Sequence, residues 1–222
     1  MNEYHKIQTV FKRDPDNNFK TLLDGEYSMP EFEYLKNNIW VFTEKVDGTN
    51  IRIMFDGESI KFGGKTDNAM IPSVLLNKLN ETFLPQVEKF KSIFDCPVCL
   101  YGEGYGAKIQ KGGGNYRQDQ DFVLFDVRIG DFWLQREDVS DISVKLDIDI
   151  VPVIERGNLF ELVNMVKNGF DSTWGPFKAE GIVARPEVEL FTRNGKRIIT
   201  KLKTKDFTHK KLFGGEDEEI KR

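Results

Sequence analysis

Short apolar segments separated by glycine turns are the feature that most constrains how this sequence can fold. They are rich in β-branched and aromatic residues, and the first of them cover residues 39–44, 50–55 and 59–62. Asp47-Gly48 and Asp56-Gly57 lie between them, and Asp-Gly is a favoured pair for the tight turn of an antiparallel hairpin. The pattern therefore predicts an antiparallel meander over residues 39–66.

Further strands and a few helices follow. Strand-like runs cover residues 98–102, 121–129, 180–185 and 197–202. Helical spacing predicts one helix over 71–94, interrupted at Pro85, and another over 159–168. In the first helix, helical spacing is seen at Val74, Leu75, Leu79 and Phe83. Hairpin-connected strands with inserted helices favour an α+β fold, with antiparallel sheets and flanking helices, over a doubly wound sheet.

The composition is that of a soluble globular protein, because 39% of the 222 residues are hydrophobic and 31% are charged. A net charge of −4 neither supports nor excludes a nucleic-acid partner, since an acidic protein can bind one through a local basic face. No apolar run reaches the roughly 18 residues of a membrane span, and the N-terminus lacks the apolar core of a signal peptide. We expect a cytoplasmic protein with no membrane partner.

The sequence contains two cysteines, Cys96 and Cys99. A structural zinc site needs about four ligands, and the two histidines, His5 and His209, lie far away in the sequence. We therefore expect both cysteines to be free thiols in a reducing compartment.

Lys45 is the candidate nucleophile. It follows an apolar strand and Glu44, and it precedes the Asp47-Gly48 turn, where a side chain can be aimed at a ligand. A lysine amine becomes nucleophilic where burial or a cationic neighbour lowers its pKa. One lysine is weak support, so the assignment depends on residues further along the chain.

Three other lysines can meet phosphate groups. Lys201 and Lys203 share one face of a predicted strand, since side chains alternate along it, and that face meets either solvent or a polyanion. The basic run continues to Lys211. Lys65 lies in a Gly-Lys-Thr sequence, but a phosphate-binding P-loop needs a glycine where Ser59 stands. Lys65 can still bind phosphate from the end of a strand.

Two acids and one aromatic residue complete the candidate set. Glu103 lies between glycines, Glu180 begins an apolar strand, and Phe125 lies in the most apolar strand. Taken singly, the acids are typical turn residues and Phe125 is a typical core residue. Together with the lysines they describe a nucleotide site, with acids for ribose hydroxyls and a divalent metal and an aromatic for the base. A lysine in such a site favours nucleotidyl transfer, in which the amine attacks the α-phosphate and pyrophosphate leaves.

The order of these motifs resembles that of the covalent nucleotidyltransferases, which include ATP-dependent RNA and DNA ligases and mRNA capping enzymes. The motifs are Lys-Val-Asp-Gly-Thr-Asn, Gly-Lys-Thr, Tyr-Gly-Glu, Phe-Val-Leu-Phe-Asp-Val, Ala-Glu-Gly-Ile-Val and Lys-Leu-Lys. From about Trp40 to Lys211 the chain is most similar to the nick-sealing phage-type RNA ligases (RNA ligase type 2). The resemblance implies a nucleotidyltransferase (ATP-grasp-like) domain over 1–211, in which 1–38 is a peripheral segment, followed by an acidic tail over 212–222.

The resemblance also implies a role for each candidate residue. Lys45 becomes adenylylated, and Glu180 supports a Mg²⁺ or Mn²⁺ ion through water. Lys201 and Lys203 contact the α-phosphate of ATP, and Glu44 and Phe125 contact the adenine. Glu103 binds the ribose, and Asn50 and Lys65 contact phosphate or ribose. The implied reaction passes AMP from Lys45 to an RNA 5′-phosphate and then joins that end to a 3′-hydroxyl.

Two departures from the family pattern leave alternatives open. Type 2 ligases often carry His where Asp47 stands, whereas Asp is usual in the wider superfamily. Little sequence follows Lys203, so we expect no C-terminal accessory domain in this chain, which is either a catalytic domain cut from a longer protein or a minimal ligase.

Three functions therefore remain. The first is a monomeric RNA ligase acting on RNA ends in a cytoplasm, that of the host if a phage encodes it. The second is a nucleotide-binding or nucleic-acid-binding remnant of the fold that does not ligate. The third is a DNA ligase or a capping-type enzyme, and Asn50 disfavours the latter, since capping enzymes usually have Arg there.

Overall fold

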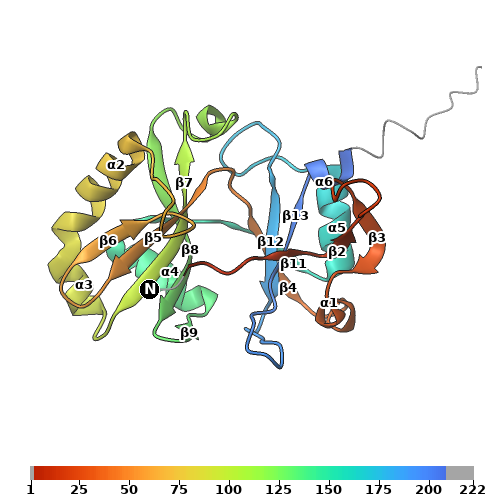
Figure 1. Cartoon of the computed structure of the whole chain (residues 1–222), viewed down its shortest axis with the longest axis horizontal. Coiled ribbons are helices and arrows are strands. Elements are labelled where there is room, and N and C mark those ends of the chain that lie inside the picture. The colour runs from red at the N-terminus through yellow and green to blue at the C-terminus, as the bar shows by residue number, and fades with distance from the viewer. Residues whose placement is uncertain (1–2, 209–222) are drawn as a thin grey trace, which may run out of the picture. The chain divides into compact units, whose positions relative to one another are not determined.

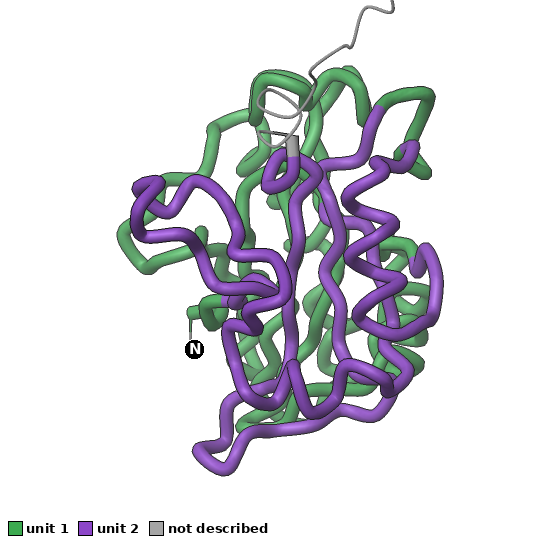
Figure 2. The backbone as a smooth tube through the Cα atoms, turned by 90° about the vertical axis from the view of Figure 1, so that its right-hand side faces the viewer, with its two compact units in different colours: residues 1–6, 46–152, 172–177 green, residues 7–45, 153–171, 178–222 purple. Residues whose placement is uncertain are grey.

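The computed structural model describes residues 3–208 and divides the chain into two compact units (Figure 2). Unit 1 contains residues 1–6, 46–152 and 172–177, and unit 2 contains residues 7–45, 153–171 and 178–222. The acidic tail and the basic residues His209, Lys210 and Lys211 lie outside the described residues. The backbone passes from unit 2 into unit 1 at the Lys45–Val46 peptide bond.

Unit 1 is built on a mixed sheet with helices against it (Figure 1). Within the described residues this sheet has six strands, which are β5 (Thr49–Phe55), β6 (Ile60–Gly63), β7 (Val98–Gly106), β8 (Gln120–Ile129), β9 (Phe132–Trp133) and β10 (Asp149–Ile150). All pairings are antiparallel except that of β10 with β8. The helices are α2 (Ser73–Phe83), η1 (Leu84–Gln86), α3 (Val87–Ile93), η2 (Gly113–Asn115) and α4 (Arg136–Leu146).

The core of unit 1 lies between the sheet and its helices. Ile51, Ile53 and Phe55 alternate along β5 and are fully buried against apolar side chains of α2, α3 and α4. Alternate burial of this kind is the period-two pattern of a strand with one face on a core. The opposite face of β5 is therefore the one that carries Asn50 and Arg52.

Unit 2 is built on a second sheet. Within the described residues it has five strands in the order β1 (Gln8–Thr9), β13 (Thr200–Lys203), β12 (Gly181–Pro186), β4 (Trp40–Glu44) and β11 (Val153–Gly157), antiparallel except for β1 with β13. A hairpin of β2 (Phe11–Arg13) and β3 (Leu22–Tyr27) and the helices α1 (Pro30–Tyr34), α5 (Leu159–Asn168) and α6 (Lys205–Thr208) complete the unit.

The core of unit 2 joins β4, β12 and β13 to α5 and to the N-terminal elements. Leu162 of α5 packs with Phe42, Ile182 and Leu202 of the sheet, and all four are fully buried. The start of α5 is fixed by a capping box, in which Asn158 accepts hydrogen bonds from backbone amides and Glu161 accepts one from the amide of Asn158. The segment 1–38 contributes buried side chains to this core, among them Val10, Phe11, Leu22 and Phe32.

The predicted α+β class is confirmed, since largely antiparallel sheets and flanking helices make up the described part of the chain. The predicted meander over 39–66 is wrong at Asp47-Gly48. Strand β4 pairs with β11 and β12, whereas β5 pairs with β6 and β7, so the turn connects two different sheets. Strand β4 has partners on both edges, which leaves no free edge for β5. The turn at Asp56-Gly57 does form the predicted hairpin.

The helical region 71–94 contains α2 and α3, with η1 at Pro85, as expected. Leu75, Leu79 and Phe83 are fully buried, but Val74 is 61% exposed. The buried three are spaced by four residues, so they form one stripe, and Val74 lies about 100° around the helix from Leu75. None of the helices within residues 3–208 is long and apolar enough to cross a membrane.

Candidate active site

Lys45 lies at the end of β4, where strand register brings it beside the start of β12. Glu44 pairs with Ile182, and the Lys45 backbone amide donates to the Gly181 carbonyl oxygen at 2.9 Å. Gly181 is also the register partner of Lys203 on β13. Three residues far apart in sequence, Lys45, Glu180 and Lys203, are thereby brought together within unit 2.

Among these three side chains, the Glu180 carboxylate has two cationic partners. Lys45 Nζ lies 2.5 Å from Glu180 Oε2, and Lys203 Nζ lies 2.6 Å from Glu180 Oε1. The exposed fractions of the three side chains are 19%, 11% and 23%, so the group is partly shielded but open to a ligand. Charge-assisted hydrogen bonds of this length are among the stronger polar contacts in proteins. The cluster carries a net positive charge, which suits a phosphate group.

The other predicted residues of unit 2 are placed by the same sheet. Lys201 and Lys203 are half-buried and alternate with the fully buried Leu202, which confirms that the two lysines share a face of β13. Glu44 is 1% exposed. Any contact it makes with a ligand must therefore involve a small part of its surface.

In unit 1, Asn50 and Glu103 are register partners on β5 and β7. The Asn50 Oδ1 atom is buried and has no hydrogen-bond partner among the described residues. A buried acceptor without a partner costs free energy, so it is a natural place for a hydrogen bond from a ligand. Glu103 is half-buried.

Phe125 on β8 is partly buried beside Val46 and Tyr105. Tyr4, from the short N-terminal part of unit 1, contacts the Phe125 ring edge-on with centroids 5.0 Å apart. The Tyr4 hydroxyl donates to Asp126 Oδ2 at 2.6 Å. No feature of the sequence near residue 4 indicates this contact, because it joins residues 122 positions apart.

Lys65 is exposed, but the backbone next to it is held by a buried arginine. Arg52 Nε donates to the Gly64 carbonyl oxygen at 2.9 Å, and its Nη2 pairs with Asp67 at 2.7 Å. Arg52 was not among the sequence candidates, although its position two residues after Asn50 places both on one face of β5.

The donor set bears on the expected metal ion. Among residues 3–208, no cluster of three or more histidine, cysteine or acidic side chains is arranged to hold a metal. Glu180 offers the oxygen chemistry that Mg²⁺ and Mn²⁺ accept, and such ions are commonly held by one or two carboxylates together with substrate phosphates. Glu180 therefore fits a metal that arrives with a nucleotide. Cys96 is exposed and Cys99 is buried, and both are free thiols, as expected.

The RNA ligase family model matches residues 38–203. Solved structures with the same fold include RNA ligase mutants from Naegleria gruberi, one with ATP and Mn (TM-score 0.66, 16% identity, 91% of this chain and 56% of that chain) and one with AMP and Mn (TM-score 0.65, 17% identity, 95% and 60%). The ligase of the same organism with PPi gives a TM-score of 0.65 at 18% identity, over 95% of this chain and 60% of that chain.

The chain thus spans less than two thirds of the length of these structures, and at such identities they show a shared fold. A comparison with curated proteins found no match. The family model covers most of the chain, and it includes every candidate residue of the two units. This chain belongs to the RNA ligase family.

Proposed function

We propose that the chain is the nucleotidyltransferase (ATP-grasp-like) part of an ATP-dependent RNA ligase, with Lys45 as the residue that becomes covalently adenylylated. The observation that carries the proposal is the Glu180 carboxylate held between the Lys45 and Lys203 ammonium groups. A lysine at the end of a strand, partly shielded and beside a second cation, is where an amine can meet an α-phosphate.

In the first step, Lys45 Nζ attacks the α-phosphorus of ATP. The new bond joins nitrogen to phosphorus, the bond from phosphorus to the bridging oxygen breaks, and pyrophosphate leaves with that electron pair. The amine must lose its proton before attack, and Glu180 Oε2, which lies 2.5 Å from it, is placed to accept that proton. Lys201 and Lys203 offset the charge that grows on the phosphate oxygens.

Divalent metal chemistry fits the same residues. A bound Mg²⁺ or Mn²⁺ would supply charge neutralisation for the phosphates. Within this chain, Glu180 would hold such an ion through water. Solved relatives were obtained with ATP and Mn, which supports the choice of nucleotide and metal.

The remaining proposed contacts to ATP follow from the family resemblance. Phe125 would stack on the adenine and Glu103 would accept hydrogen bonds from ribose hydroxyls. Asn50 would use its unpartnered Oδ1, and Lys65 would reach phosphate or ribose from the loop held by Arg52. Glu44 would meet the adenine edge, in part through its backbone.

The later steps consume the lysyl-AMP. The 5′-phosphate of one RNA end attacks the AMP phosphorus and releases Lys45, and a 3′-hydroxyl then attacks the RNA 5′-phosphorus and releases AMP. RNA ends are thus the proposed partners. We further propose that the protein acts as a monomer in a cytoplasm, which is that of the host cell if a phage encodes the chain.

Labelling with ATP that carries the isotope in the α-phosphate tests the proposal. Wild-type protein with Mg²⁺ should retain label through denaturing electrophoresis, Lys45→Ala should not, and Lys61→Ala, whose side chain is exposed, should label like wild type. Wild type that binds ATP without labelling would instead be a nucleotide-binding remnant.

Competition by GTP and NAD, followed by nicked duplexes with RNA or DNA on the 3′-hydroxyl side, separates an RNA ligase from the other enzyme classes. Preferential sealing of RNA with ATP is the expected result. Equal or better sealing of DNA, or labelling by GTP, would contradict it.

A further inference from the structure

The Asp47-Gly48 turn follows Lys45 and belongs to unit 1. It is held by side chains from a distant loop of unit 1. The backbone amide of Asp47 donates to the Tyr116 hydroxyl at 3.2 Å. The Gln110 side-chain amide donates to the Gly48 carbonyl oxygen at 3.0 Å. Both contacts are made to backbone groups, so they fix the path of the chain and do not depend on the side chains of the turn.

The turn is also fixed by packing against buried residues and against the backbone of β7. Val46 is 3% exposed and packs in a small apolar cluster with Tyr105 and Val123. A Cβ atom on Gly48 would lie 2.2 Å from the Gly104 carbonyl oxygen, so the turn sits directly on the backbone of β7. Close approach of two backbones requires glycine at this position.

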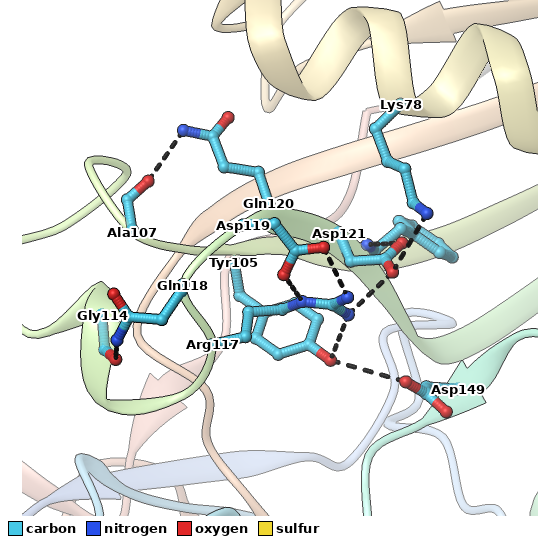
Figure 3. A network of polar contacts seen from close by, with 11 residues as sticks. Lys78, Tyr105, Ala107, Gly114, Arg117, Gln118, Asp119, Gln120, Asp121 and Asp149 are labelled. Atoms are coloured by element: carbon cyan, nitrogen blue, oxygen red, sulfur yellow. Dashed lines mark hydrogen bonds and ion pairs between the residues drawn. The ribbon is translucent and has the colours of Figure 1, made fainter.

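The loop between β7 and β8, which supplies Tyr116 and Gln110, is itself anchored by ion pairs (Figure 3). Arg117 pairs with Asp119 at 2.6 Å and with Asp121 at 2.7 Å. Hydrogen bonding to Asp119 raises the pKa of Arg117, and the same contact lowers the pKa of Asp119. Lys78 of α2 extends the network to Asp121 at 3.8 Å. These anchors make the loop a fixed support.

Aromatic packing orients the Tyr116 hydroxyl. The Tyr116 ring meets Phe177 and Trp174 edge-on, with centroids 4.9 and 5.7 Å apart. Its hydroxyl can therefore reach the turn only along a restricted direction.

We propose that Tyr116 and Gln110 are positioning residues for Lys45, which hold the Asp47-Gly48 turn so that the lysine amine is aligned with the α-phosphate. The inference rests on the proposed function. Lys45 is fixed on its N-terminal side by β4, and these two contacts fix the chain two and three residues after it. Rates of group transfer are sensitive to such alignment, whereas nucleotide affinity depends on other residues.

The test is a single-turnover measurement of adenylylation at varied ATP concentration. Removal of either contact should lower the maximal rate about tenfold or more, while the ATP concentration for half-maximal rate stays within about twofold, since only the attack geometry changes. Tyr116→Phe removes the hydroxyl and keeps the ring packing. Gln110→Glu keeps the side-chain length and removes the donor, and because Gln110 is exposed, folding should be unaffected.

Gln118 provides a matched control. Its side-chain amide donates to the Gly114 carbonyl oxygen at 2.9 Å, in the same loop but away from the turn. Gln118→Glu should therefore label at the wild-type rate, and all variants should melt near wild type.

The outcomes separate the two proposals. Unlabelled wild type would overturn the proposed function and the positioning role together. Labelled wild type with Gln110→Glu no slower than Gln118→Glu would overturn the positioning role alone. A change in ATP concentration dependence without a change in maximal rate would also overturn it, because it would indicate contact with ATP.

Discussion

The Glu180 carboxylate pairs with the Lys45 amine at 2.5 Å, and its other oxygen pairs with Lys203 at 2.6 Å. The proposed nucleophile is thus engaged in an ion pair. A protonated amine has no lone pair, so this contact must change before attack. Phosphate oxygens of ATP are suitable new partners for Lys203.

Glu180→Gln tests this relationship. The substitution keeps the shape of the side chain, removes its charge and leaves two ammonium groups close together. We expect adenylylation to slow by about 10²-fold, a typical effect of removing a preorganised electrostatic partner. Rapid-quench labelling measures the rate, and thermal melting reports any loss of structure. Labelling at the wild-type rate would show that Glu180 takes no part in the first step.

Lys201→Ala and Lys203→Ala should each reduce adenylylation far more than stability. Both side chains are only half-buried on β13, so each substitution should cost about 1 kcal/mol of stability, a typical effect of a point mutation. Lys12→Ala is the matched control, because Lys12 also forms an ion pair but lies on β2. Urea unfolding measures the free-energy change. A large loss of stability with normal labelling would indicate a structural role for the lysines.

Asn50 should show opposite effects on stability and nucleotide binding. Its Oδ1 is a buried acceptor without a partner in the described residues, and such a group costs about 1–3 kcal/mol. Asn50→Val suits a strand and removes this cost, so the unfolding free energy should stay equal or rise. Calorimetric titration should show weaker ATP binding. A marked loss of stability with unchanged ATP affinity would refute this assignment.

The two cysteines should differ sharply in reactivity. Burial raises the pKa of Cys99 to about 11, whereas Cys96 is exposed. At pH 8 an alkylating reagent should modify Cys96 quickly and Cys99 only when β7 opens, since the thiolate is the reactive form. Mass spectrometry of Cys96→Ser against wild type measures both rates.

The same shift predicts a pH effect on stability. The pKa of Cys99 is higher in the folded chain than in the unfolded chain, where a thiol has a pKa of about 8.5. The contribution of Cys99 to the free energy of unfolding is therefore complete below the unfolded pKa and is lost as the pH rises towards the folded pKa. The free energy of unfolding of the wild type should therefore fall between about pH 8.5 and about pH 11. The fall should be smaller for Cys99→Ala, which lacks the thiol. Equal alkylation of both thiols in native buffer would contradict the buried position.

Local patterns predicted most elements but not their partners. The helix over 159–168 matches α5, because apolar spacing and the Asn158 cap both act within the segment. The Asp47-Gly48 turn looked like a hairpin, but β4 pairs with β11 and β12, which are distant in sequence. Helix α4 was missed, because charged and polar side chains interrupt its apolar spacing. Its buried residues are Val139, Ile142, Ser143 and Leu146.

The candidate site divides in the same way. Alternation along a strand was enough to place Lys201 and Lys203 on one face, and the structure confirms it. The pairing of Glu180 with Lys45 depends on the register between β4 and β12, which no local pattern encodes. Tyr116 and Gln110 lie in a loop without secondary-structure periodicity, so only the folded chain shows that they meet the turn after Lys45.

Mapping the AMP adduct tests the central claim most directly. The protein is incubated with ATP, Mg²⁺ and pyrophosphatase, digested under conditions that preserve phosphoramidates, and sequenced by tandem mass spectrometry. The account predicts one AMP group, on Lys45. No adduct, or an adduct on another lysine such as Lys65 or Lys203 while Lys45 stays unmodified, would contradict it.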